Sequence, residues 1–406
     1  MRVRVVTARA GGPRERDLHA AGVPVAIGDG TVERLAELLA GAQVVHPFRG
    51  GGREPLVPQA AARAGAQVLV ETNVFGQVDP SDGERFDCHL FVSKMCAIRY
   101  RRRRGLDGAA FHRAHRVSYW PLALDRMRAL APEPAAAKAA LGLDPARPVV
   151  GRLGRDDDRK WRDILVDMAP RLLELVPDVQ LLLVGATPAK LRRLDRLGLL
   201  DRVRFVPPTS DEEELLRLYR ACDVFVTAAE IGESHSVAIC EALALGIPVV
   251  TCSTPWVDNA QIEQVDDGVD GFVADHPRAF ADAVARIAGD PELRARFGAA
   301  AAAKADARWD VVPLTRQLEQ LYAGLLAGEP PSEWQPPLAD VDAFGEDYER
   351  RLAARTFPLT PSEEREARRA RTSERIRWAF RALRRLDRER AALALSMLRA
   401  KLAPSA

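Results

Sequence analysis

Short apolar runs alternate along the chain with longer stretches in which apolar positions recur every three or four residues. The longer stretches predict helices, for example at residues 31–39 and 55–64. The short runs predict two series of strands: residues 2–7, 23–27, 43–46, 67–71, 90–92 and 116–119, then residues 148–153, 179–184, 203–206, 224–227, 248–251 and 271–273. Such alternation is typical of parallel sheets covered by helices, so we expect an α/β fold with two lobes.

Turn and capping residues predict where elements and lobes end. Ser210 and Glu213 have the spacing of a capping box, which predicts a helix start there. Prolines separate the two series of strands, and a second group of prolines follows the last predicted helix of the second series. The predicted parts are a first lobe at residues 1–140, a second lobe at 141–327, a proline-rich linker at 328–346 and a basic helical tail at 347–406.

Composition narrows the range of partners. The 59 Lys and Arg residues nearly balance the 57 Asp and Glu residues, so no overall field attracts nucleic acid or a membrane. The five cysteines show no metal-ligand spacing, and Met1 leads into a strand-like run rather than a signal peptide. No apolar run approaches the roughly 20 residues that span a bilayer. We therefore expect a cytoplasmic protein, with at most peripheral contact at the inner face of the membrane.

The predicted tail carries an apolar stripe flanked by arginines. Ile376, Phe380, Leu383 and Leu398 fall at helical spacing. We expect the stripe to pack on protein, either the first lobe or a second subunit, because apolar stripes usually bury against protein. Lying on an anionic membrane is the alternative. Binding of nucleic acid is disfavoured, because no aromatic residues interleave with the basic ones.

The most informative segment reads G-E-S-H-S-V-A-I-C-E-A-L-A-L-G at residues 232–246. Ser234 or Ser236 as the N-cap would leave Glu233 on the entering loop and place Glu241 about one and a half turns into a helix. Free backbone N–H groups between the two carboxylates suit a diphosphate, Glu241 suits a ribose diol, and Glu233 suits sugar hydroxyls. The alternative is a pair of surface glutamates at an ordinary helix start. The residues that would surround the ligand are Ser234, His235, Ser236 and Val237.

This segment resembles the donor-site signature of the retaining glycosyltransferases with the GT-B fold, also called glycosyl transferases group 1. The signature is Glu, seven residues, Glu, a small-residue helix and Gly-x-Pro-Val-Val, and the resemblance extends over residues 148–322, including L-L-V-G ending at Gly185. It implies two Rossmann-like lobes and a UDP- or GDP-linked sugar held by the second lobe. In the family the first Glu contacts the sugar and the second the ribose. The residues at 234–236 depart from the small residues usual there.

A phosphate clamp is expected on the loop after the first strand of the second lobe. The resemblance implies an Arg and, five or six residues later, a Lys, which Arg155 and Lys160 match; Arg152 is the rival. These charges would replace the metal that other glycosyltransferases need, so we expect no cofactor. The alternatives are a solvated loop or a metal site at the acidic triplet, residues 156–158, where a cation would compete with the clamp.

The first lobe offers weaker signals. Gly12 and Gly51 lie on glycine-containing loops that could approach a phosphate or sugar, although neither loop forms G-x-G-x-x-G. Asn73 takes the place where the family often carries a His that touches the donor sugar. His46, at a strand end, is expected to be structural. Polar residues at 254–263 follow a second-lobe strand and are candidates to seat the donor sugar.

Together these signals predict a metal-independent transferase that moves a sugar to an unidentified acceptor with retention of configuration. The resemblance implies front-face attack assisted by the leaving phosphate, with Glu233, Arg155 and Lys160 stabilising charge. A nucleotide-sugar epimerase or a phosphorylase of the same fold is one alternative. An inactive nucleotide-sugar binding or scaffold protein is another, suggested by the unusual residues at 73 and 234–236.

Overall fold

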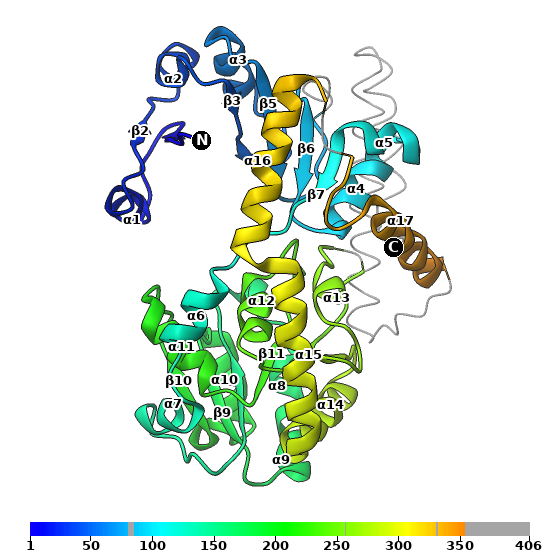
Figure 1. Cartoon of the computed structure of the whole chain (residues 1–406). Helices are drawn as coiled ribbons and strands as arrows, with labels where there is room; N and C mark the ends of the chain where they lie inside the picture. Colours follow the sequence, from blue (N-terminus) through cyan, green and yellow to red (C-terminus); the bar gives the residue numbers. More distant parts are fainter. Residues whose placement is uncertain (80–84, 256, 330–331, 354–406) are drawn as a thin grey trace, which may run out of the picture. The chain divides into compact units, whose positions relative to one another are not determined.

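The computed structural model describes residues 1–79, 85–255, 257–329 and 332–353, and these form an α/β fold with parallel sheets in two lobes (Figure 1). The predicted stripe between Ile376 and Leu398 lies outside the described residues. Every predicted strand is present. One short strand, β4 (Phe48–Arg49), was not predicted, because two residues carry no periodic signal.

The first lobe contains two separate sheets rather than one. β1 (Val5–Thr7) and β2 (Val25–Ile27) pair only with each other, and the larger sheet has the order β3-β5-β6-β7 with β4 beside β5. The strands of the larger sheet are β3 (Val44–Val45), β5 (Val68–Asn73), β6 (Cys88–Phe91) and β7 (His115–Val117). The helices are α1 (Glu15–Ala20), α2 (Val32–Leu39), α3 (Leu56–Arg63), α4 (Lys94–Arg104) and α5 (Gly108–Ala114).

The second lobe contains a six-stranded parallel sheet in the order β10-β9-β8-β11-β12-β13. Its strands are β8 (Val149–Arg152), β9 (Gln180–Val184), β10 (Val203–Val206), β11 (Val224–Thr227), β12 (Val249–Thr251) and β13 (Gly271–Val273). Its helices are α6 (Leu124–Leu130), α7 (Pro134–Ala140), η1 (Asp158–Lys160), α8 (Ile164–Asp167), α9 (Ala169–Leu175), α10 (Pro188–Arg196), η2 (Leu200–Arg202), α11 (Glu212–Arg220), α12 (Val237–Ala244), α13 (Gln261–Gln264), α14 (Pro277–Gly289) and α15 (Pro291–Trp309).

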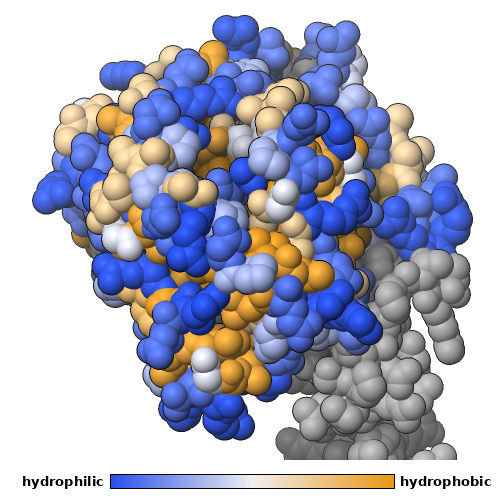
Figure 2. All heavy atoms as spheres, turned by 90° about the horizontal axis from the view of Figure 1, so that it is seen from below, coloured by the Kyte–Doolittle hydropathy of each residue, from blue (hydrophilic) through white to orange (hydrophobic). Residues whose placement is uncertain are grey.

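The central strands of this sheet are buried on both faces. β8 and β11 contain no exposed residue, as the near-continuous apolar runs predicted. Val149 and Phe225 belong to the core on one face, and Val150 and Val226 to the core on the other. Seen from below in Figure 2, apolar and hydrophilic residues are interspersed on the outer surface. The two cores show that helices cover both faces of the sheet. The loops of interest follow the carboxyl ends of its strands.

One predicted helix start was wrong by one residue. Helix α11 is capped by Asp211, whose carboxylate accepts a hydrogen bond from the backbone N–H of Glu214 at 2.9 Å. Ser210 and Glu213 therefore do not form the predicted capping box. Asp211 and Glu214 have the same spacing one residue later, and a carboxylate near the positive end of the helix is favourable.

Two helices beyond the second sheet pack on the first lobe. α16 (Val311–Ala327) lies against β5, and Leu321 shares a buried cluster with Val68 and Trp334 (Figure 1). α17 (Leu338–Ala353) packs on α4 and begins inside the predicted linker. Its apolar residues Val341, Phe344 and Tyr348 recur at helical spacing, which explains why the segment is helical despite the prolines before it.

Candidate functional site

The strand order of the second sheet reverses between β8 and β11, so the loops after these two strands are neighbours. Lys160 lies on the loop after β8, and Glu233 lies on the loop after β11. Lys160 Nζ is 2.8 Å from Glu233 Oε2, and the two side chains are only 20% and 15% exposed. Burial raises the pKa of Glu233, and the Lys160 ammonium opposes that rise. The structure therefore brings two of the three predicted catalytic residues into contact.

Helix α12 begins as the motif predicts. Its N-cap is Ser236, one of the two predicted cap residues, although the Ser236 side chain makes no capping hydrogen bond. Glu241 lies in the same helix and is mostly buried, and its Oε2 accepts a hydrogen bond from Tyr219 Oη at 2.7 Å. Burial raises the pKa of Glu241, and the Tyr219 hydroxyl lowers it. Glu241 is therefore a held carboxylate rather than a freely solvated surface glutamate.

The two candidate clamp arginines have different surroundings. Arg152 is buried, stacks over the Trp161 ring at 4.0 Å, and donates hydrogen bonds to the carbonyl oxygens of Lys160 (2.9 Å) and Val184 (3.1 Å). Burial lowers the pKa of Arg152 to about 9. Arg155 is exposed, and its guanidinium makes no hydrogen bond or ion pair with any described residue. Arg152 is thus used to hold the loop, whereas Arg155 is available to a ligand.

The three residues of the acidic triplet, 156–158, make different contacts. Asp157 caps η1 through the backbone N–H of Arg159 and pairs with the Arg159 guanidinium at 2.8 Å. Asp158 accepts a hydrogen bond from the Thr187 hydroxyl at 2.5 Å, and Asp156 is exposed. In the described ranges, no three His, Cys, Asp or Glu side chains form a group suited to a metal ion. Nor does any helix within those ranges have the length and apolarity to cross a bilayer.

Two predicted positions depend on backbone geometry. Gly185 directly follows β9 and has a φ of +69°, and a side chain there would collide with the Gly154 carbonyl oxygen. The Gly185 carbonyl accepts a hydrogen bond from Trp161 Nε1 at 2.9 Å, so this glycine fixes the loop that carries Lys160. Ser234 contributes its backbone carbonyl, which accepts a hydrogen bond from the Cys96 thiol of the first lobe. Val237 is the first residue of α12 and is half-buried.

His235 is buried at the start of the motif. Its ring lies 5.5 Å from that of Trp120 and 6.2 Å from that of Tyr119, and Nε2 is 3.5 Å from the Cys240 sulfur. Burial lowers the pKa of His235 to about 4. The side chain therefore packs as an uncharged aromatic group, while its backbone stays on the loop between Glu233 and α12.

The first-lobe candidates do not form one group. Asn73 belongs to the end of β5 rather than to the loop after it, and its amide donates to the Gln77 carbonyl at 2.9 Å. Gly51 has a φ of +80° and packs against Asn73, where any side chain would collide. Gly12 is exposed and lies beside the separate two-stranded sheet. Among the described residues it contacts neither Asn73 nor Gly51. His46 lies between the hydroxyls of Thr72 (2.8 Å) and Tyr322 (2.5 Å).

Sequence reasoning missed a buried charge cluster in the first lobe. Arg49 Nη1 is 3.1 Å from Glu71 Oε2, and Glu71 Oε1 is 2.7 Å from His89 Nδ1. The His89 ring stacks on that of His115 at 4.8 Å, and burial lowers the pKa of His115 to about 3. The sequence indicated this cluster only by placing an ionisable residue in each of two apolar strands, Glu71 in β5 and His89 in β6. The cluster holds the β4 end next to β5.

The polar segment at 254–263 is engaged in protein contacts. Asp258 pairs with Arg99 of α4, and Asn259 Oδ1 accepts a hydrogen bond from the Thr254 backbone N–H at 2.7 Å. Gln261 Oε1 accepts one from the backbone N–H of Glu233 at 3.2 Å. These residues therefore support the loop that carries Glu233, a role that their sequence did not reveal.

Comparison with known proteins finds similarity to glycosyltransferases over part of the chain. Residues 147–290 match the family model described as glycosyl transferases group 1. The chain is 42% identical over 149 residues to D-inositol 3-phosphate glycosyltransferase of Mycobacterium sp. (strain KMS), covering 35% of this chain and 32% of that protein. It is 32% identical over 173 residues to phosphatidyl-myo-inositol mannosyltransferase of Mycobacterium leprae, covering 42% and 45%. The matches span less than half the length of either relative.

A solved structure supports the fold over more of the chain. The Anabaena protein HepE, in complex with UDP and glucose, superposes with a TM-score of 0.62 and covers 77% of this chain and 90% of its own. The two sequences are 20% identical. This likeness shows the fold of both lobes, whereas the family match rests on the second lobe.

Proposed function

We propose that this chain, whose residues 147–290 form a glycosyl transferases group 1 domain, is a glycosyltransferase that uses a nucleotide sugar. The observation that carries the proposal is the contact of Lys160 with Glu233 at the strand-order reversal, directly before the N-terminus of α12. A cation, a carboxylate and a positive helix end at one place are what a sugar joined to a diphosphate requires.

The donor would be held by its three chemical parts. Backbone N–H groups at the α12 N-terminus and the Arg155 and Lys160 side chains would contact the diphosphate. Glu241, fixed by Tyr219, would accept hydrogen bonds from the ribose hydroxyls. Glu233 would contact the sugar. We infer a UDP- or GDP-linked donor, in line with the UDP bound by the Anabaena relative of similar fold.

Charge neutralisation would drive departure of the diphosphate. Lys160 and Arg155 would stabilise the negative charge that develops on the leaving group, without a metal ion. Glu233 would stabilise positive charge on the sugar while the acceptor hydroxyl attacks from the face that the diphosphate leaves. The bond from the sugar to the diphosphate breaks, and the hydroxyl proton passes to an oxygen of the departing diphosphate. This path retains the anomeric configuration and forms no covalent bond to the protein.

The acceptor is proposed from the relatives. Both curated relatives are named for inositol-containing acceptors, so an inositol phosphate is the first acceptor class to test.

The experiment is a donor and acceptor matrix on the full chain. UDP-glucose and GDP-mannose are each incubated with and without D-inositol 3-phosphate, and release of nucleoside diphosphate and formation of product are measured. Release that requires the acceptor supports the proposal. Conversion of donor without acceptor would indicate an epimerase, and dependence on free phosphate would indicate a phosphorylase. Donor binding without release under any condition would indicate a binding protein.

A further inference from the structure

The short helix α13 carries three polar side chains that are all buried. Gln261, Glu263 and Gln264 are 2%, 7% and 1% exposed. Burying polar groups in this way is costly unless each finds a partner, so their partners show what the helix is for. The two glutamines face the loop that carries Glu233, and the glutamate contacts the first lobe.

The glutamines fix the backbone of the donor loop, which we define as residues 228–236. Gln261 Oε1 accepts a hydrogen bond from the Glu233 N–H at 3.2 Å. Gln264 binds Ser236 twice: Oε1 accepts from the Ser236 N–H and Nε2 donates to the Ser236 carbonyl, both at 3.0 Å. The Ala260 N–H, just before α13, donates to the Glu233 carbonyl at 2.7 Å. Residues of α13, and Ala260 directly before it, therefore hold the donor-loop backbone at Glu233 and at Ser236.

Glu263 links the same helix to the first lobe. Its Oε1 accepts a hydrogen bond from the Lys94 N–H at 2.9 Å, and its Oε2 accepts one from the Met95 N–H at 3.0 Å. These are the first two residues of α4, so the carboxylate lies at the positive end of that helix. The Arg308 side chain donates to the Glu263 carbonyl at 3.2 Å, which holds Glu263 from the second lobe.

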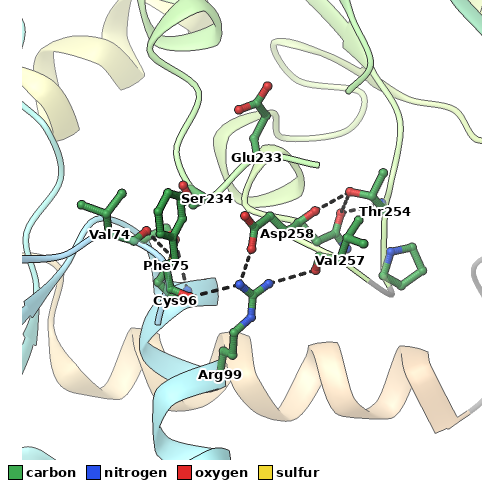
Figure 3. A network of polar contacts seen from close by, with 12 residues as sticks. Val74, Phe75, Cys96, Arg99, Glu233, Ser234, Thr254, Val257 and Asp258 are labelled. Carbon is green, nitrogen blue, oxygen red and sulfur yellow. Dashed lines mark hydrogen bonds and ion pairs between the residues drawn. The ribbon is translucent and has the colours of Figure 1, made fainter. Parts of the chain in front are cut away.

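A second contact lies one turn further along α4. Arg99 forms an ion pair with Asp258, and its guanidinium also donates to the carbonyls of Val257 (2.9 Å) and Phe75 (3.1 Å). Figure 3 shows Arg99 pointing from α4 toward Asp258, with Glu233 and Ser234 on the neighbouring segment. The Asp258 N–H in turn donates to the Ile231 carbonyl of the donor loop at 3.3 Å. Both contacts of α4 therefore connect to the donor loop within one or two hydrogen bonds.

We propose that Glu263 is a positioning residue that ties the α4 N-terminus of the first lobe to the placement of Glu233, through α13. The inference rests on the proposed function, because it assigns Glu263 to the alignment of the group that contacts the donor sugar. Diphosphate binding, which depends on Lys160, Arg155 and the α12 N-terminus, would not depend on Glu263. Loss of Glu263 should therefore reduce turnover and leave binding of the nucleoside diphosphate intact.

The test compares Glu263→Gln with a matched control, Asp223→Asn. Asp223 is also a carboxylate that accepts a backbone N–H, that of Val149, at 2.7 Å, but it lies at the opposite end of the second sheet. For Glu263→Gln we expect kcat to fall about 10- to 100-fold, the effect of a small misplacement of a reacting group, with KM for the donor and Kd for UDP or GDP within twofold of the parent. Asp223→Asn should leave kcat unchanged.

Arg99→Gln provides a second variant, at a side chain that is 17% exposed, and its melting temperature is measured to check that the fold is retained. This variant should also have a lower kcat than the parent. Hydrogen exchange of peptides covering residues 228–236 adds a readout that needs no turnover: exchange there should rise in both variants and stay at the parent level in Asp223→Asn. Parent-like kcat together with parent-like exchange in Glu263→Gln would overturn the inference. If the parent itself shows no transfer, the proposed function fails, and the exchange result alone decides whether Glu263 holds the donor loop.

Discussion

Lys160 and Glu233 form an ion pair of 2.8 Å across two loops that follow adjacent strands of the second sheet, although they are 73 residues apart in the chain. The pair means that a bound phosphate would compete with Glu233 for the Lys160 ammonium. Removing the Glu233 charge should therefore not weaken diphosphate binding, and this separates its role from that of Glu241.

Glu241→Ala should weaken binding of the nucleoside diphosphate about 10- to 100-fold, because a charged hydrogen-bond partner contributes about 1.5–3 kcal/mol. Tyr219→Phe is the control, since it keeps the carboxylate and removes only its 2.7 Å hydrogen bond. That variant should bind more tightly than Glu241→Ala. Calorimetric titration with UDP and GDP measures both, and parent-like affinity of Glu241→Ala would exclude it from the ribose site.

The two arginines should respond differently to truncation. Arg155→Ala should reduce transfer by about 10²-fold, as expected for loss of a preorganised charge, and leave the melting temperature unchanged because its side chain is exposed. Arg152→Ala should lower the melting temperature, because Arg152 holds the carbonyls of Lys160 and Val184. Thermal melting and a transfer assay give both readouts. Full activity of Arg155→Ala would reverse the assignment of the clamp.

Buried histidines should make the fold sensitive to acid. Burial lowers the pKa of His235 from 6.5 to about 4, so the unfolded chain takes up this proton at a higher pH than the folded chain does. The resulting stability is complete above pH 6.5 and is lost as the pH falls towards 4, by at most about 1.4 kcal/mol per pH unit. His235→Phe should flatten this decline in urea unfolding measured at pH 7, 6 and 5. An identical pH slope in the variant and the parent would contradict the burial of a neutral imidazole.

Two shortened chains test the C-terminal part. A chain that ends at residue 328 loses the buried side chains of Trp334, Val341 and Tyr348, so it should melt at a lower temperature or aggregate. A chain that ends at residue 353 keeps them and removes only residues 354–406, most of the predicted tail. A lower melting temperature of this second chain would support packing of the tail on protein. An unchanged melting temperature with lost binding to anionic vesicles would support the membrane alternative.

The sequence predicted the local elements well and the long-range contacts poorly. Strands such as β8 and β11 were predictable because they are buried on both faces, which requires continuous apolar runs. Lys160 was predicted as a site residue from the family resemblance, and Glu233 from the resemblance and its place before a helix start. The two meet because loops after parallel strands gather at one edge of the sheet. The capping residue of α11 was misplaced by one position, since Asp211 and Ser210 are both good caps and only the backbone path selects between them.

Contacts between distant side chains gave no sequence signal. Arg49, Glu71 and His89 pair across three strands, and the sequence around each of them does not indicate that the other two are near. Glu263 was predicted to lie near the donor sugar, yet its partner is the N-terminus of α4, 168 residues away. Such pairings depend on how elements pack against one another in three dimensions. The periodicity of a single segment gives no information on that packing.

The most direct test of the account compares the full chain with Glu233→Gln. Binding of the nucleoside diphosphate and acceptor-dependent release of that diphosphate from the donor are measured on both proteins. The account predicts that Glu233→Gln binds UDP or GDP at least as tightly as the parent, because Lys160 loses its partner, and that transfer falls by about 10²-fold or more. Transfer by Glu233→Gln at the parent rate would contradict the assignment of this site.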